Sequence, residues 1–420
     1  MNLNELFPST AIRGTNKELF VGRAKVLKES LIYAQKPGAV LVIIGERGIG
    51  KSSLAWQTLS VLSGNTEIFE MQSYKFSKTN LNKYNCVYVE CNSDTNNIDG
   101  IIKKLLVKED SNKTDEEQKN IYSLYKELNQ AQEYTKLLQE NIGISEPENI
   151  DIKENNQDFS LPDKLKDRFI NLIKKINEQL ENELIIFIDE FDAIKDKGGI
   201  SDLLKTAHGV KFVIIGIGDG IHDIIEDHKS TKRKIRPIIL DRLTEKDIED
   251  YISKAQVKIG NTKISFKDDF SKNVYTYSDG YPPLVQKFCD TVMDIIQLED
   301  LENEKVFIDD IYFEKSFKKV LDDETMLNVD LELWRKKVNY VGKEKILFFL
   351  AEYNGWIKEK DLKVKNTYRF KDNIKELLQD CLIKKDSYEC YKFLNPYFRL
   401  IVKDIVNKNG NLYIFEKKTN

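Results

Sequence analysis

The feature that most constrains this chain is a glycine-rich segment, residues 45–53, directly after the apolar run of residues 39–44. Its spacing is G-x-x-x-x-G-K-[ST]. Glycine is needed there because the backbone must wrap a phosphate chain at close range, where a side chain would obstruct it. The helix-compatible stretch of residues 53–59 completes a strand–loop–helix context. The segment therefore predicts a phosphate-binding loop, and a glycine-rich turn is the alternative.

This P-loop assigns specific roles to its residues. Backbone N–H groups and the helix starting near Lys51 would face the phosphates. Lys51 would reach the β- and γ-phosphates, and Ser52 would ligate Mg²⁺. The expected ligands are ATP and Mg²⁺. The predicted nucleotide-binding residues are Gly45, Gly48, Ile49, Gly50, Lys51, Ser52 and Ser53.

Two adjacent acids follow a second apolar run, residues 184–188. Five apolar residues in succession predict a strand that is buried on both faces, as parallel sheets require. The acids then match a Walker B motif, in which Asp189 would hold Mg²⁺ through water and Glu190 would polarise the water that attacks the γ-phosphate. The alternative is a pair of acids that solvate a turn.

Further apolar runs predict the rest of a parallel α/β sheet, at residues 86–92, 210–216 and 236–240. We place this ATPase core at residues 1–242, a helix-only lid at 243–325 and a winged-helix domain with a C-terminal tail at 326–420. The last assignment depends on order: two helical stretches precede a hairpin that turns at residues 385–387.

Residues 109–160 interrupt the core with thirteen acids and five bases. An apolar repeat at helical spacing predicts one protruding helix with polar flanks. We therefore expect an insertion, and deletion of residues 115–155 should leave folding and ATP binding intact. The repeat consists of Ile121, Leu124, Leu128, Ala131, Tyr134 and Leu138.

Composition narrows the class of protein further. The 420 residues carry a net charge of −4, but residues 339–420 hold seventeen bases and eleven acids, so the C-terminal part is at +6 and the rest is near −10. That part could approach a polyanion. The five cysteines and three histidines form no metal-ligand pattern. The N-terminus lacks a signal pattern and no apolar run could span a bilayer, so we expect a cytoplasmic protein without membrane contact.

Together the motifs resemble the prokaryotic AAA+/STAND P-loop ATPases, related to origin-recognition initiators and archaeal ATPases. The resemblance spans about residues 19–400 and includes the P-loop, residues 188–192 and residues 280–282. It implies an ASCE-type P-loop core with a helical lid and a winged helix. Upstream, Val21, Gly22 and Arg23 would wall the adenine ring, unless they form only a turn before a surface helix.

The resemblance also implies two contributions from outside the P-loop. In the STAND branch a proline contacts the adenine, and Pro282 is the matching residue. The family usually completes the site with an arginine from a neighbouring subunit, which implies a homo-oligomer. Arg233 is the chosen candidate, although it could instead offset a helix dipole. A polar sensor residue is expected after the fourth core strand, where only Asp219 is available.

Two functions remain open. In the first, an ATP-dependent switch assembles with its own copies and applies its winged helix to double-stranded DNA, as initiators and transposition regulators do. Five basic residues lie in and before the second helix of the predicted winged helix, but three acids there reduce its net positive charge. In the second, a STAND-type signalling or antiphage-defence ATPase uses the winged helix on protein, and an effector protein delivers the output. The cations are Lys363, Lys365, Arg369, Lys371 and Lys375.

Overall fold

A computed structural model describes residues 6–7, 10–13, 16–72, 81–93, 95, 97–106, 120–128, 130–142, 162–196, 200, 203–204, 209–218, 233–260, 263–299, 301, 305–323, 343–362 and 369–408. The chain divides into two compact units. One comprises Thr10–Asp241, and the other comprises Met1–Ser9 with Arg242–Asn420. The first nine residues thus group with the second unit, although the sequence analysis placed them in the core. The predicted boundary between lid and winged helix, after residue 325, lies outside the described residues.

Five parallel strands form the sheet of the first unit, in the order β2-β3-β4-β1-β5. Strands β1 and β3 are buried along their whole length, as expected when helices cover both faces. The predicted α/β fold with a parallel sheet is confirmed. The strands are β1 (Val40–Gly45), β2 (Asn85–Glu90), β3 (Leu184–Asp189), β4 (Lys211–Ile217) and β5 (Ile235–Ile239).

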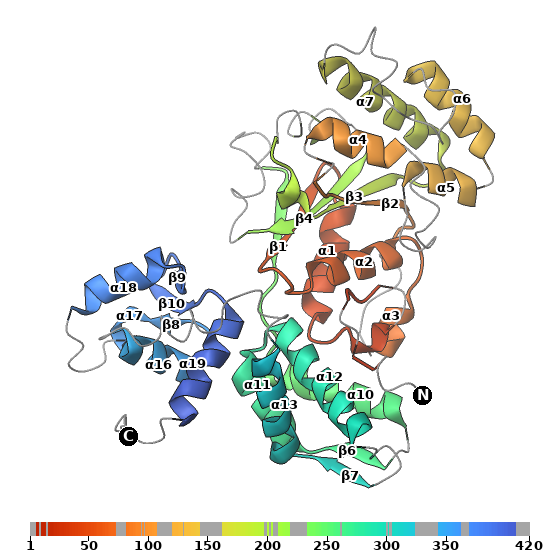
Figure 1. Cartoon of the computed structure of the whole chain (residues 1–420). Coiled ribbons are helices and arrows are strands. Elements are labelled where there is room, and N and C mark those ends of the chain that lie inside the picture. The colour runs from red at the N-terminus through yellow and green to blue at the C-terminus, as the bar shows by residue number, and fades with distance from the viewer. Residues whose placement is uncertain are drawn as a thin grey trace. The chain divides into compact units, whose positions relative to one another are not determined.

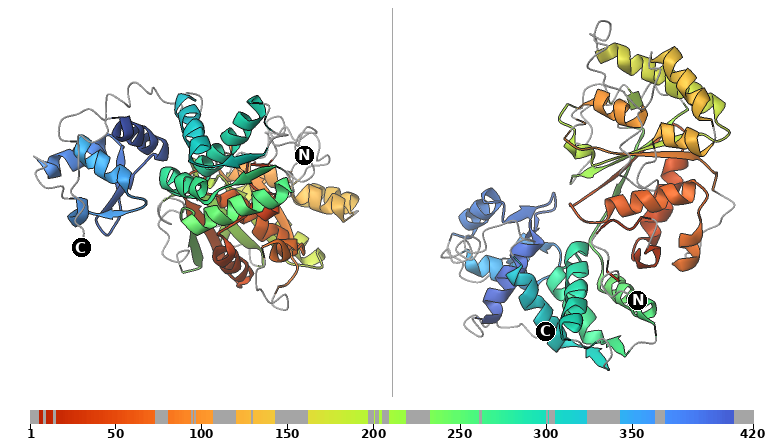
Figure 2. Two further views of the ribbon diagram at one scale, coloured as in Figure 1. Left: turned by 90° about the horizontal axis from the view of Figure 1, so that it is seen from below. Right: turned by 45° about the vertical axis from the view of Figure 1, so that its right-hand side comes forward.

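Helices lie on both faces of this sheet, as Figure 1 and the right-hand view of Figure 2 show. Helices α1 (Ala24–Gln35) and α2 (Lys51–Leu62) cover one face. Helices α4 (Ile98–Leu106) and α7 (Pro162–Gln179) lie over the other. The short elements η2 (Lys17–Leu19), α3 (Glu67–Met71) and η4 (Phe191–Ala193) complete the unit.

The predicted insertion contains two helices, α5 (Ile121–Glu127) and α6 (Ala131–Asn141). Their apolar side chains are buried in the same core as strands β1–β4 and helix α7. The expectation of one protruding helix is therefore wrong for this segment. Leu128 was assigned to the apolar repeat but is 42% exposed, because α5 ends there. The predicted polar flanks lie mostly outside the described residues.

The predicted lid region holds four helices, which account for most of residues 243–323. It also contains a two-stranded parallel sheet, so the expectation of a helix-only segment is wrong. Helix α12 starts with Pro282 at its first position, where the missing N–H is no loss. The elements are α10 (Glu245–Ile259), β6 (Ile264–Phe266), α11 (Asp268–Ser278), α12 (Pro282–Leu298), β7 (Val306–Ile308) and α13 (Asp310–Asp322).

The C-terminal elements have a core of their own. A three-stranded sheet of order β8-β10-β9 includes the predicted hairpin, formed by antiparallel β9 and β10. The order of helices and strands is that expected of a winged helix, which stays a prediction. The elements are α16 (Glu344–Glu352), β8 (Ile357–Lys358), α17 (Glu359–Leu362), α18 (Phe370–Gln379), β9 (Ile383–Lys385), β10 (Cys390–Phe393) and α19 (Pro396–Lys408).

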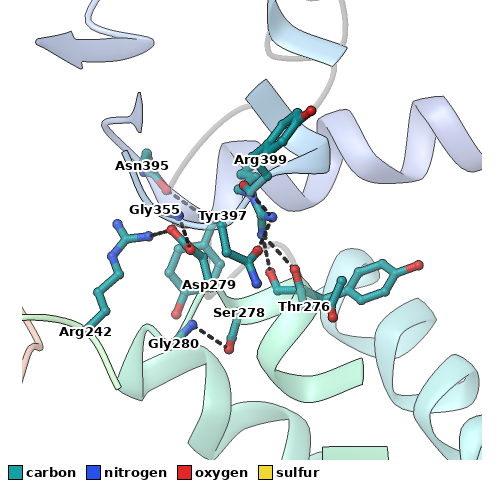
Figure 3. Close-up of polar contacts among 12 residues, drawn as sticks. Arg242, Thr276, Ser278, Asp279, Gly280, Gly355, Asn395, Tyr397 and Arg399 are labelled. Carbon is teal, nitrogen blue, oxygen red and sulfur yellow. Dashed lines mark hydrogen bonds and ion pairs between the residues drawn. The ribbon is translucent and has the colours of Figure 1, made fainter. Parts of the chain in front are cut away.

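The turn between α11 and α12 is bonded to two other segments of this unit, one just before α10 and one just after α16 (Figure 3). Asp279 forms an ion pair with Arg242 and accepts a hydrogen bond from the Gly355 N–H at 2.6 Å. Gly280 has a φ of 68°, and a Cβ there would lie 1.9 Å from the carbonyl oxygen of Leu243. Only glycine fits this position.

A buried arginine makes the second connection between the lid helices and the C-terminal elements (Figure 3). Arg399 of α19 is 2% exposed. Its guanidinium donates to the carbonyl oxygens of Thr276 and Tyr277, at the end of α11, and of Tyr353, after α16. It also donates to Asn354 Oδ1 at 2.6 Å. A cation suits this place because helix carboxyl ends carry partial negative charge.

Candidate functional site

The predicted P-loop connects the buried strand β1 to helix α2, as its sequence context required. Gly45 ends β1, and Lys51 begins α2. Gly50 lies between them with a φ of 99°, a left-handed conformation that favours glycine. The Lys51 side chain is folded back over the loop, since its Nζ donates to the carbonyl oxygens of Gly45 at 3.3 Å and Glu46 at 2.9 Å. Lys51 is 7% exposed.

The predicted Walker B acids lie at the same edge of the sheet. Because β1 and β3 are parallel, their carboxyl ends face one way, so Asp189 at the end of β3 lies on the P-loop side. Glu190 has a φ of 51°, which is uncommon for a residue with a side chain and recurs at functional sites. Asp192 accepts a hydrogen bond from the Ile217 N–H at 2.8 Å, which joins this turn to the end of β4.

Burial and mutual repulsion set the electrostatics of this edge. The pKa of the Asp189 carboxyl is raised, chiefly by burial. Burial also raises the pKa of Glu190, and the neighbouring charges of Asp189 and Asp192 add to the effect. The pKa of Lys51 is lowered by burial, against the attraction of these three acids. A concentration of negative charge thus faces the P-loop lysine, which is a setting that favours bound cations.

Sequence reasoning assigned no role to three residues that this structure brings to the site. The Tyr88 hydroxyl donates to Asp189 Oδ2, and Asp192 is bonded to β4 as described above. Arg13 lies with its guanidinium carbon 5.2 Å from the Trp56 ring centroid and pairs with Glu90 at 3.3 Å. A tyrosine two residues before the end of an apolar strand was the available signal, because alternate residues share a face.

Ser52 and Ser53 differ in their contacts. The Ser52 hydroxyl lies close enough to the Asp189 carboxylate to lower the pKa of that carboxyl, in part against the effect of burial, so both side chains could contact one metal ion. Ser53 Oγ instead accepts the Ile12 N–H at 3.0 Å, so its side chain holds the segment that precedes η2. A phosphate contact of Ser53 would therefore use its backbone N–H.

Arg23 lies against the P-loop, although its observed contacts are with the protein. Its guanidinium donates to the carbonyl oxygens of Asp241 at 2.7 Å and of Ile49 at 3.0 Å. Val21 is buried next to it in the chain, and Gly22 has a φ of 68°. That these residues wall an adenine ring stays a prediction.

No protein-family model matches the chain, and neither does any curated protein sequence. Solved structures do resemble it. The Walker-type ATPase PABY2304 of Pyrococcus abyssi is 14% identical, with 96% of this chain and 99% of that chain covered and a TM-score of 0.49. The Aeropyrum pernix ORC2 protein, in ADPNP–ADP complexes, is 12% identical, with coverage of 96% and 98% and a TM-score of 0.47. Cdc6p of Pyrobaculum aerophilum is 14% identical, with coverage of 97% and 98% and a TM-score of 0.45. Likenesses of this order say nothing about the ligand or the reaction of this chain.

The oxygen donors at the sheet edge suit a Mg²⁺ ion whose other ligands are phosphate oxygens and waters. Within the described ranges, no group of three or more His, Cys, Asp or Glu side chains could enclose a metal. Mg²⁺ needs no such group beside a nucleotide, because it keeps waters and takes one or two protein oxygens together with phosphate oxygens. Asp189, 2% exposed and near Ser52, offers such oxygens.

The structure gives three further predicted residues no contact with the P-loop that can be described. Arg233 precedes β5, whose first residue, Ile235, pairs with Val40. It therefore lies at the opposite end of the sheet strands from Gly45. Pro282 belongs to the other unit, and Asp219 lies outside the described residues, as do His208, His222 and His228. In the part of the chain that the structure describes, no helix is long and apolar enough to cross a bilayer.

Proposed function

We propose that this chain binds ATP with Mg²⁺ at the P-loop and hydrolyses it, and that nucleotide controls its assembly with further copies of itself. The P-loop backbone and the start of α2 bind the phosphates, and Lys51 contacts their β- and γ-oxygens. Ser52 and Asp189 hold the Mg²⁺, which neutralises charge on the phosphate oxygens when bound.

Glu190 is the proposed general base. It accepts a proton from a water whose oxygen attacks the γ-phosphorus, while the bond from that phosphorus to the β–γ bridging oxygen breaks. ADP and inorganic phosphate are the products. The raised pKa of Glu190 makes its carboxylate a stronger proton acceptor than an exposed glutamate.

One observation carries this proposal: the parallel strands β1 and β3 end at the same edge of the sheet, where Lys51 begins α2 and Asp189 ends β3. The test compares two variants. Lys51→Ala should abolish tight ATP binding, whereas Glu190→Gln should bind ATP with parent affinity and lose roughly 10²–10⁴-fold in turnover. Calorimetry and phosphate release measure these quantities. Parent-like binding by Lys51→Ala would contradict the P-loop proposal, and unchanged turnover of Glu190→Gln would move the base elsewhere.

We propose further that the C-terminal elements act on double-stranded DNA. The excess of positive charge in residues 339–420 supports this. Two lysines of the small sheet flank the Trp356 ring, which is 41% exposed: the Nζ atoms of Lys384 and Lys392 lie 5.6 Å and 4.7 Å from the ring centroid. Lys384 is the more accessible of the two, since Lys392 is only 8% exposed.

A contrasting observation favours a protein partner, as in a STAND-type signalling or defence ATPase with a separate effector. Two acids of α18 pair with cations from outside the helix: Asp372 with Arg369 at 2.9 Å, and Glu376 with Lys343 at 2.6 Å. A helix that inserts into the major groove usually presents a net positive face.

Retention on immobilised duplex DNA at increasing salt distinguishes the two partners. If the chain contacts DNA, the logarithm of its binding constant should fall linearly with the logarithm of the salt concentration, with a slope of about −0.9 for each phosphate neutralised. The variant Lys384→Ala should make that slope shallower by about 0.9, and Lys136→Ala on the exposed side of α6 is the control. No retention at low salt would leave the protein partner as the better proposal.

A further inference from the structure

We propose that Tyr88 is a positioning residue that fixes the Asp189 carboxylate in the orientation needed to receive Mg²⁺. This inference rests on the proposed function, in which Asp189 and Ser52 hold the ion. Tyr88 would touch neither the nucleotide nor the metal, and it would act only through Asp189.

Both oxygens of the Asp189 carboxylate are held by donors on the protein. Oδ2 accepts the Tyr88 hydroxyl, and Oδ1 accepts the Glu190 N–H at 2.7 Å. An ionised carboxylate offers about four lone-pair sites, so these bonds fix its plane and leave sites for a metal or its waters. Without the Tyr88 hydroxyl, one oxygen would lose its donor from β2.

The backbone register explains how a strand residue reaches this carboxylate. Tyr88 pairs with Phe187, and Val89 and Glu90 pair with Ile188 and Asp189. Asp189 is thus two residues beyond the partner of Tyr88, and residues two apart on a strand share a face. Long side chains reach such diagonal neighbours across a sheet.

Packing leaves the Tyr88 ring little freedom to turn away. Its ring centroid lies 4.6 Å from that of Trp56 on α2 and 6.5 Å from that of Phe187 on β3. Tyr88 is buried. Because Trp56 belongs to the helix that Lys51 begins, the ring connects the P-loop helix to the carboxylate. Outer-shell groups of this kind typically change metal affinity or activity 10–100-fold when they are removed.

A core tyrosine with a satisfied hydroxyl is the competing interpretation, and Tyr134 provides a matched control. Its hydroxyl, also buried, donates to the Leu106 carbonyl oxygen at 2.6 Å, away from the site. Tyr88→Phe and Tyr134→Phe make the same chemical change. A purely structural role predicts similar effects of both variants on stability and none on Mg²⁺ dependence.

The experiment measures the affinity of the full chain for a fluorescent ATP analogue, in EDTA and in a MgCl₂ series. Tyr88→Phe should bind within about 2-fold of the parent in EDTA, and its gain in affinity from Mg²⁺ should shrink roughly 10-fold. The Mg²⁺ concentration for half-maximal turnover should rise by a similar factor. Tyr134→Phe should match the parent in both measurements.

An Asp189→Asn variant separates failure of the inference from failure of the proposed function. Loss of the Mg²⁺-dependent gain in Asp189→Asn, with a partial loss in Tyr88→Phe, supports the inference. Loss in Asp189→Asn with a parent-like Tyr88→Phe overturns it and leaves the metal site in place. If Asp189→Asn instead keeps the Mg²⁺-dependent gain of the parent, Asp189 does not hold the ion. That outcome overturns both the inference and the proposed metal site.

Discussion

Arg399 and Lys403 are buried cations one helical turn apart on α19, and their environments differ. Arg399 donates to four oxygens at helix ends and turns. Lys403 is 6% exposed, and its Nζ lies 4.8 Å from the Tyr277 ring centroid. Burial lowers the pKa of Lys403 to about 8, with the charge of Arg399 adding to the effect. Lys403 therefore destabilises the folded state at neutral pH.

This shift predicts a specific pH dependence of stability. The pKa of Lys403 lies below its usual value of 10.5, so the folded protein releases this proton first as the pH rises. From about pH 8 to 10.5 the unfolded state binds more protons, and the contribution of Lys403 to the free energy of unfolding therefore rises with pH. Below about pH 8 both states are protonated and the burial cost is complete.

Lys403→Met should accordingly raise the free energy of unfolding at pH 7, by about 1–3 kcal/mol. Its advantage over the parent should shrink between pH 8 and 10. Urea unfolding of both proteins at several pH values measures the difference, in which shared titrations cancel. Lys371→Met on the exposed surface of α18 is the control. A difference that is constant with pH would show that Lys403 titrates normally.

At the scale of elements, helices α5 and α6 belong to the core of the first unit. Tyr134, Leu138 and Ile121 are buried in the cluster that also contains Val87 of β2 and Phe169 of α7. A polar insertion joined by its two ends would bury little against its host. The burial of an apolar stripe against α7 instead makes these helices part of the first unit.

Deletion of residues 115–155 should therefore yield insoluble or unfolded protein, which reverses the expectation from sequence. The point variant Leu138→Ala should lower the free energy of unfolding by about 2–5 kcal/mol, since it leaves a cavity in this core. Lys136→Ala, on the exposed side of α6, should change it by less than about 0.5 kcal/mol. Thermal unfolding of the variants is the measurement. A soluble deletion product that binds ATP would contradict this assignment.

At the scale of the whole molecule, the predicted catalytic role of Arg233 requires another copy of the chain. It precedes the edge strand β5, at the opposite strand ends from Gly45. Its backbone carbonyl accepts a hydrogen bond from Arg236 at 3.1 Å, while its side chain is exposed. A catalytic arginine supplied in trans needs an edge position of this kind.

If Arg233 completes a neighbour's site, Arg233→Ala should bind ATP normally but hydrolyse it roughly 10³–10⁵-fold more slowly. Mixing it with Lys51→Ala should restore part of the activity, because one subunit supplies the arginine and the other an intact P-loop. Lys234→Ala is the neighbouring control. Phosphate release across mixing ratios tests the idea, and it fails if mixing gives no rescue or if Arg233→Ala keeps full rate.

The sequence by itself determined the local features of this protein. The apolar runs predicted the five parallel strands that the structure describes, most clearly β1 and β3, because a strand covered on both faces must be largely apolar. Gly45 and Lys51 were identified by their spacing after one apolar run, and Asp189 and Glu190 by their position directly after another. These inferences need only neighbours in the chain.

The tertiary structure decided what depends on partners distant in sequence. The hydroxyl of Tyr88 finds Asp189, 101 residues away, only through strand register. The apolar repeat of residues 121–138 predicted one helix where the structure has two, and it could not identify the surface that buries them. Likewise Arg399 looked like one more cation of a basic C-terminal region. In the structure its buried guanidinium joins the ends of two helices, α11 and α16. No local sequence pattern indicates such a contact.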